Sequence, residues 1–153
     1  MASSLEEMTV QVFFFEDLSL GQMAEASRVV GMSDIEAFAA VSGDTNPVHL
    51  DEGYAQTTTF KTRIAHGMLS GAYISAMLGT TLPGPGAIYL SQSLRFRRPV
   101  RIGDAVVTRA TVSALDETRG HVTLATLCQV EGKTVVDGEA VVMVSRRTPA
   151  AAP

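Results

Sequence analysis

Apolar residues recur at helical spacing in the first half of the chain. Residues 33–36, Ser-Asp-Ile-Glu, have the form of a capping box, with Ser at the N-cap and Glu three residues later. We therefore predict a helix over residues 33–42. A loop is predicted over residues 44–49, because Pro47 disfavours helical backbone at the residue before it. A further short helix is predicted over residues 51–56.

A second helical stretch is predicted from near Gly67 to about Leu78, and it has almost no polar face. Its apolar members are Met68, Leu69, Ala72, Tyr73, Ile74, Ala76 and Met77. A helix that is apolar all round, in a chain without a membrane span, is expected to be buried. Gly79 is the predicted C-terminal cap, and the Pro-Gly run at residues 83–86 predicts a loop.

From Ala87 onward, apolar positions alternate with a period of two, which is typical of strands. The first strand places Ile88, Leu90, Leu94 and Phe96 on one face. Three more strands are predicted around residues 106–114, 121–131 and 133–145, joined by short turns. The sequence therefore predicts an α+β fold, in which a curved antiparallel sheet of about four strands wraps around the apolar central helix.

The chain length of 153 residues fits one domain with its own hydrophobic core. Residues 1–12 are predicted to be an N-terminal extension, residues 13–145 the folded domain and residues 146–153 a flexible tail. The net charge of −4 argues against a nucleic-acid partner, because phosphate binding requires a basic surface.

The sequence also predicts where the protein works. No segment reaches the roughly 18 apolar residues that a membrane span requires. The first ten residues lack the basic and apolar regions of a secretory signal. Cys128 is the only cysteine and lies in an alternating segment, so we expect a buried strand thiol in a reducing compartment. These features favour a cytoplasmic protein without a membrane partner.

Asp44 and His49 are the first candidates for chemistry, because they lie five residues apart across a proline-bent loop. In a regular helix this spacing would not place them on one face, but in a turned loop the side chains can converge. A carboxylate and an imidazole that converge can hold one water, as hydration of a conjugated thioester requires. Taken alone, the spacing favours Asp44 as a loop cap and His49 as a hydrogen-bonded packing residue.

Five segments follow one another in a recognisable order: Phe15–Leu18 with Gly21, Ser42–Asp51, Ala65–Leu69, Tyr89–Phe96 and Gly103-Asp104. Together they resemble the MaoC-like dehydratases, and specifically the single-domain (R)-specific enoyl-CoA hydratases. The resemblance covers roughly residues 13–145, and the segment from Asp44 to His49 is its most specific part. It implies a hot-dog fold.

The resemblance also implies catalytic roles for four residues. Asp44 and His49 would bind and activate the water, and one of them would return a proton to C2 of the substrate. The backbone N–H of Gly67, at a helix start, would polarise the thioester carbonyl, although a plain turn glycine also fits. Ser75 would support the catalytic pair, unless its hydroxyl bonds back to its own helix.

Substrate binding is assigned to five further residues: Asn46, His66, Arg95, Arg97 and Arg98. Asn46 either orients the catalytic loop or is a simple turn residue. His66 is expected to fix that loop rather than to transfer protons. The arginines form a basic cluster in an acidic chain, which suits the phosphates of coenzyme A. A solvated strand end, or acyl carrier protein as the carrier, fits the same cluster.

The predicted function is therefore reversible hydration of trans-2-enoyl-CoA to (R)-3-hydroxyacyl-CoA, without a cofactor. No metal site is predicted, because three separated histidines and one cysteine show no ligand spacing. A hot-dog acyl-CoA thioesterase and a non-catalytic acyl-thioester-binding subunit are the alternatives. One sheet around one helix leaves an exposed edge and apolar surface, which hot-dog proteins cover by pairing. The resemblance therefore implies a homodimer or higher homo-oligomer, with its sites near the interface.

Overall fold

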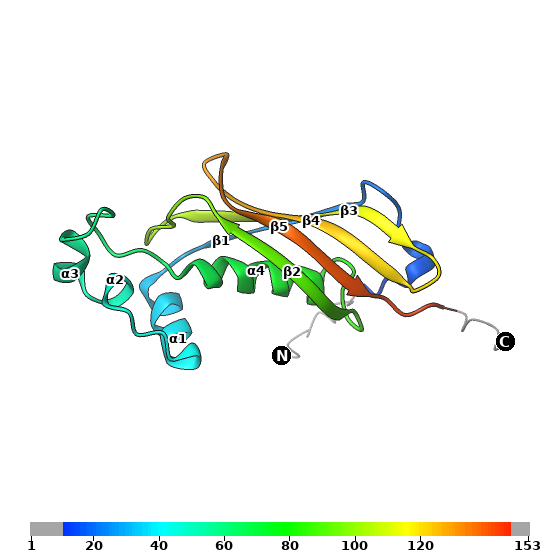
Figure 1. Ribbon diagram of the computed structural model, residues 1–153, viewed down its shortest axis with the longest axis horizontal. Helices are drawn as coiled ribbons and strands as arrows, with labels where there is room; N and C mark the ends of the chain where they lie inside the picture. Colours follow the sequence, from blue (N-terminus) through cyan, green and yellow to red (C-terminus); the bar gives the residue numbers. More distant parts are fainter. Residues whose placement is uncertain (1–10, 148–153) are drawn as a thin grey trace, which may run out of the picture.

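Five antiparallel strands form one twisted sheet, and the long helix α4 lies along one face of it (Figure 1). The computed structural model describes residues 11–147. The strands are β1 (Met23–Val29), β2 (Ile88–Phe96), β3 (Ala105–Asp116), β4 (His121–Val130) and β5 (Lys133–Met143). Their spatial order is β1-β3-β4-β5-β2, and each neighbouring pair is antiparallel. The predicted α+β arrangement of sheet and central helix is therefore confirmed.

Strand β1 was not predicted from the sequence. It pairs with β3 along its whole length, from Met23 opposite Thr111 to Val29 opposite Ala105. Most of its residues are exposed, so they do not alternate between apolar and polar as the residues of a half-buried strand do. The strand forms because the open edge of β3 offers backbone partners. These partners lie about 80 residues further along the chain, so the local sequence does not indicate them.

Helix α4 (Gly67–Thr80) packs only one of its faces. The buried face meets the sheet through residues that join one continuous core, among them Leu69, Tyr73, Ile74, Met77 and Leu78. Residues on the opposite face, including Met68, Ala72 and Ser75, are exposed. The prediction that this helix is buried all round is therefore wrong for a single chain. Gly79 is also not the cap, because the helix continues to Thr80.

Helix α1 (Met32–Ser42) begins two residues earlier than the capping-box pattern indicated, because its N-cap is Gly31 and not Ser33. Only half of a capping box forms, at Gly31: the Asp34 carboxylate accepts a 2.8 Å hydrogen bond from the Gly31 N–H, whereas glycine has no side chain to accept in return. The helix ends as predicted, at Gly43, whose φ of 79° is the left-handed conformation that glycine adopts without strain.

Two short helices follow α1 and lie with it at one end of α4, beyond the sheet (Figure 1). Helix α2 (Pro47–Leu50) occupies part of the predicted loop, and Pro47 is its first residue. Proline is tolerated at this position because the N–H of a first helical residue has no partner within the helix. Helix α3 (Glu52–Gln56) matches the predicted short helix and is capped by Asp51, whose carboxylate accepts from the Tyr54 N–H.

The two ends of the described chain meet at the 3-10 turn η1 (Phe15–Asp17). The Phe15 side chain is buried in the core, and its N–H donates to the Ser145 carbonyl. Arg147 donates to both carboxylate oxygens of Asp17, at 2.7 and 2.8 Å, and holds the pKa of Asp17 below its usual range. Of these residues, only Arg147 belongs to the predicted tail. Residues 1–10 of the predicted extension and residues 148–153 lie outside the described residues.

Cys128 is fully buried in β4, as predicted, and burial raises the pKa of its thiol. In residues 11–147, no helix is long and apolar enough to cross a membrane.

Candidate active site

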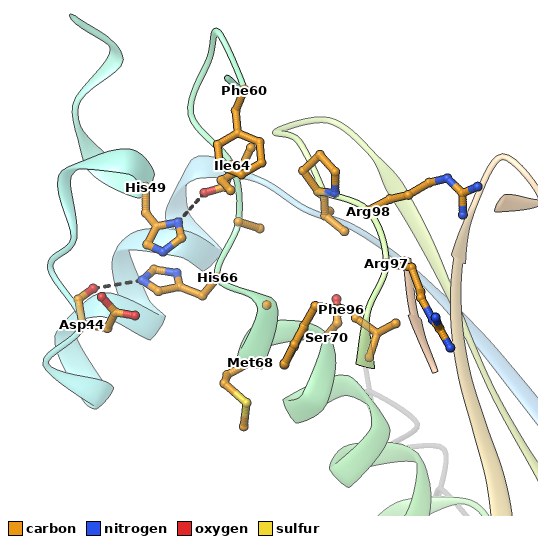
Figure 2. A pocket seen from close by; sticks show the side chains of 15 residues that line it. Asp44, His49, Phe60, Ile64, His66, Met68, Ser70, Phe96, Arg97 and Arg98 are labelled. Carbon is orange, nitrogen blue, oxygen red and sulfur yellow. Dashed lines mark hydrogen bonds between the residues drawn. The ribbon is translucent and has the colours of Figure 1, made fainter. Parts of the chain in front are cut away.

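Asp44, His49 and His66 meet at the N-terminal end of α4 (Figure 2). They come from the loop after α1, from α2 and from the residue that precedes α4. One carboxylate oxygen of Asp44 and one ring nitrogen of each histidine lie within 4.8 Å of one another. The histidines that the sequence analysis described as separated thus include two neighbours, because His49 and His66 lie 17 positions apart in the chain but stack in space.

The Asp44 carboxylate is held by its own loop. The Asp44 N–H donates to the Ser42 hydroxyl at 3.1 Å, and the Asn46 N–H donates to Asp44 Oδ1 at 3.2 Å. The Asn46 side chain accepts from the Val48 N–H and so caps α2. Asn46 does not line the pocket described below, so its contacts orient Asp44 rather than a substrate.

His49 presents one free ring nitrogen beside Asp44. Its Nδ1 lies 2.7 Å from the carbonyl oxygen of Ile64. Because a carbonyl oxygen can only accept, Nδ1 carries the proton of the neutral ring and donates it to this bond. The other nitrogen, Nε2, then keeps its lone pair. A buried histidine in this tautomer is oriented to accept a proton from a bound water.

The start of α4 forms a second part of the site. The first N–H groups of a helix have no partner within the helix, and they lie at its positive dipole end. Gly67 is the first residue of α4 and lines the pocket. A Cβ at this position would lie 2.6 Å from Cδ1 of Phe96, so glycine permits the close approach of the two elements. A substrate carbonyl can approach this backbone directly.

A pocket of about 430 Å³ joins these groups (Figure 2). Its walls are mostly apolar and include Phe60, Ile64, Phe96, Val100 and Val136. Asp44, His49 and Gly67 are among the few polar groups that reach it, a composition that is typical of small-molecule sites. Phe96 belongs to a segment that the sequence analysis had singled out. The other wall residues and Ser70 were missed, because they lie outside those segments and come from separate parts of the chain.

The predicted arginine cluster divides at the end of β2. Arg97 and Arg98 line the pocket, whereas Arg95 is exposed and does not line it. Arg97 forms an ion pair with Asp137, with 3.1 Å between Nε and Oδ2. Arg98 donates through Nη1 to the Thr134 carbonyl at 2.7 Å. The two guanidinium groups are thereby held near the pocket.

Ser75 lies elsewhere in the single chain. It is on the exposed face of α4 and lines a second groove, of about 540 Å³, between α4 and β2. Phe38, Ala72, Tyr89 and Leu94 line the same groove. The structure therefore does not bring Ser75 into the pocket with Asp44 and His49.

An antiparallel sheet wrapped on one helix defines a hot-dog protein, and in this chain a carboxylate and two imidazoles lie together at the helix start. The family model described as MaoC like domain matches residues 19–133 of the chain. The chain therefore belongs to the MaoC-like domain family.

Named relatives are similar over nearly the whole chain. The (R)-specific enoyl-CoA hydratase of Rhodospirillum rubrum is 58% identical over 134 residues, which cover 88% of this chain and 93% of that protein. The 3-hydroxybutyryl-CoA dehydratase of Methylorubrum extorquens is 47% identical, covering 92% and 90%. Among solved structures, R-Hydratase PhaJ1 from Pseudomonas aeruginosa in the unliganded form superposes with a TM-score of 0.86, at 49% identity, covering 94% and 96%.

Proposed function

We propose that the protein is an (R)-specific enoyl-CoA hydratase, which adds water reversibly to trans-2-enoyl-CoA and gives (R)-3-hydroxyacyl-CoA. The observation that carries this proposal is the convergence of the Asp44 carboxylate and the His49 ring, whose Nδ1 is held by Ile64, beside the N-terminus of α4. The names of the relatives support the same reaction. The buried single cysteine suits a reducing compartment, so the proposal includes a cytoplasmic location.

In the proposed reaction, Asp44 and His49 hold one water between them. As the water oxygen attacks C3, the neutral His49 ring accepts a water proton at Nε2. The electron pair of the double bond moves toward the thioester carbonyl, where the Gly67 N–H and the helix dipole stabilise the negative charge. The acid–base pair then returns one proton to C2. Water is thereby divided between C3 and C2, and no oxidant or cofactor is consumed.

A single assay separates this function from its alternatives. Hydration removes the absorbance of the enoyl thioester while the thioester bond survives, and chiral analysis should find the (R)-3-hydroxy product. Release of free thiol from acyl-CoA would instead identify a thioesterase. Binding of enoyl-CoA without either product would identify a non-catalytic subunit.

Arg98 is proposed to contact a phosphate of coenzyme A. We expect Arg98→Ala to raise KM for an enoyl-CoA about tenfold, the effect of losing a weak charge-assisted hydrogen bond. KM for the matching enoyl-pantetheine, which lacks the nucleotide, should not change. Arg119→Ala removes an exposed arginine at the β3–β4 turn and serves as the control. An equal rise in KM for both substrates would contradict a phosphate contact. The enoyl thioester of acyl carrier protein would then be the next substrate to test.

A homodimer is also part of the proposal. Strand β2 lies at an edge of the sheet, and its Ile88 and Leu90 side chains are 53% and 46% exposed. The exposed face of α4 adjoins this edge through the second groove. An apolar face beside an open edge favours pairing with a second chain. Since Ser75 lies on this face, its predicted supporting role requires the second chain.

We expect sedimentation equilibrium to give twice the 16.2 kDa mass of one chain. Ala72→Arg places a charge in the second groove and should shift the protein toward the monomer. Ala125→Arg, on the exposed face of β4, is the matched control and should leave the mass unchanged. A wild-type monomer at micromolar concentration, or equal effects of both variants, would contradict this interface.

A further inference from the structure

His66 lies beside each of the three residues that the proposed mechanism uses. Its ring is only 2% exposed, and its Nε2 lies 2.9 Å from the backbone carbonyl oxygen of Asp44 (Figure 2). The ring also stacks on His49, with 3.8 Å between centroids and 30° between planes. His66 directly precedes Gly67 and is the N-cap residue of α4. One side chain therefore joins the Asp44 loop, the His49 ring and the helix start.

The hydrogen bonds assign the proton on His66. Since the Asp44 carbonyl oxygen can only accept, Nε2 of His66 must carry a proton and donate it. Nδ1 of His66 is buried and has no hydrogen-bond partner among the described residues. A second proton there would bury an N–H group without an acceptor, which is costly. These contacts fit the tautomer of His66 that carries its proton on Nε2.

The stacked pair consequently holds opposite tautomers. His49 carries its proton on Nδ1 because it donates to Ile64, whereas His66 carries its proton on Nε2. The titratable groups that face the His66 ring are His49 and Asp44, and the aromatic ring of Phe38 lies 4.9 Å away. A neutral His66 allows His49 to become cationic during the reaction, since two stacked cations would repel each other.

We infer that His66 is a positioning residue for the proposed hydration, which fixes the Asp44 peptide and the His49 ring relative to each other and does not itself exchange a proton. This inference rests on the proposed function and deepens it. It differs from simple loop packing because it specifies the tautomer of each ring and predicts a loss in kcat rather than in KM.

The tautomers can be measured without any activity. The chain has three histidines, and His121→Gln leaves only the stacked pair. In two-bond ¹⁵N–¹H spectra of ¹⁵N-histidine-labelled protein, we expect His66 in the Nε2–H form and His49 in the Nδ1–H form. Two rings in the same tautomer, or a charged His66 at neutral pH, would overturn the inference. Because no substrate is present, this result is independent of the proposed function.

Two substitutions then test the positioning role. His66→Phe keeps an aromatic ring against His49 but has no donor for Asp44, and it should lower kcat about 100-fold with KM within twofold of wild type. His66→Gln keeps an N–H near the Nε2 position and should recover at least tenfold of that loss. A wild-type kcat in a folded His66→Phe, a loss confined to KM, or no recovery by Gln would refute the role. If His66→Phe does not fold, the tautomers measured in the His121→Gln protein still test the inference.

If the wild-type protein does not hydrate enoyl-CoA, the proposed function is rejected. The tautomer spectra would then test only the hydrogen bonds of His49 and His66.

Discussion

Asp44→Asn is expected to lower kcat for hydration about 10³-fold without unfolding the protein. The amide has the shape of the carboxylate, and its oxygen can still accept from the Asn46 N–H. It has no negative charge to balance a cationic His49 and cannot carry the proton between water and C2. Because Asp44 is exposed, loss of the charge leaves no buried group unpaired. Enoyl absorbance measures the rate, and circular dichroism measures the fold.

The matched control for this prediction is Asp116→Asn, a second carboxylate-to-amide change. Asp116 closes the β3–β4 turn by accepting from the Arg119 N–H, and it does not line the pocket. Its turnover should remain within about twofold of wild type. A folded Asp44→Asn protein with near-normal turnover would remove Asp44 from the mechanism, and with it the acid–base pair on which the proposed function depends.

The parts of the site that the sequence predicted are those set by local chain chemistry. Gly43 ends α1 in the left-handed conformation, and Pro47 starts a new helix four residues later. These two neighbours turn the chain sharply on either side of Asp44, so convergence with His49 could be inferred from a short segment. The apolar run of α4 likewise predicted the helix that the sheet covers.

Features that depend on distant segments were not predictable in this way. The contact of His66 with both Asp44 and His49 arises because α1, α2 and α4 meet at one end of the sheet. No pattern in the chain indicated that Arg97 and Arg98 line the pocket while Arg95 does not. One face of α4 is exposed although the helix is apolar all round, because a single sheet can cover only one side of a helix. That mismatch is itself an argument for a second chain.

A second large effect is expected from Gly138→Ala, which should lower the free energy of unfolding by about 3 kcal/mol. Gly138 lies in β5 opposite Leu94 of β2. A Cβ at this position would overlap the Ser93 carbonyl oxygen and lie 2.7 Å from its carbon. Both atoms belong to the backbone, so no side-chain rotation can relieve the clash. Strand β2 would have to move away from β5.

This displacement would reach the site and the proposed interface together, because β2 carries Phe96 to the pocket and forms the open edge of the sheet. Urea unfolding measures the loss, and it is large against a typical total stability of about 5–15 kcal/mol. Gly79→Ala is the control, since a Cβ there meets no atom within 4 Å and should add up to about 1 kcal/mol of helix stability. Equal stability of both alanine variants would mean that β2 can shift without cost, and the edge would then be too compliant to define a dimer interface.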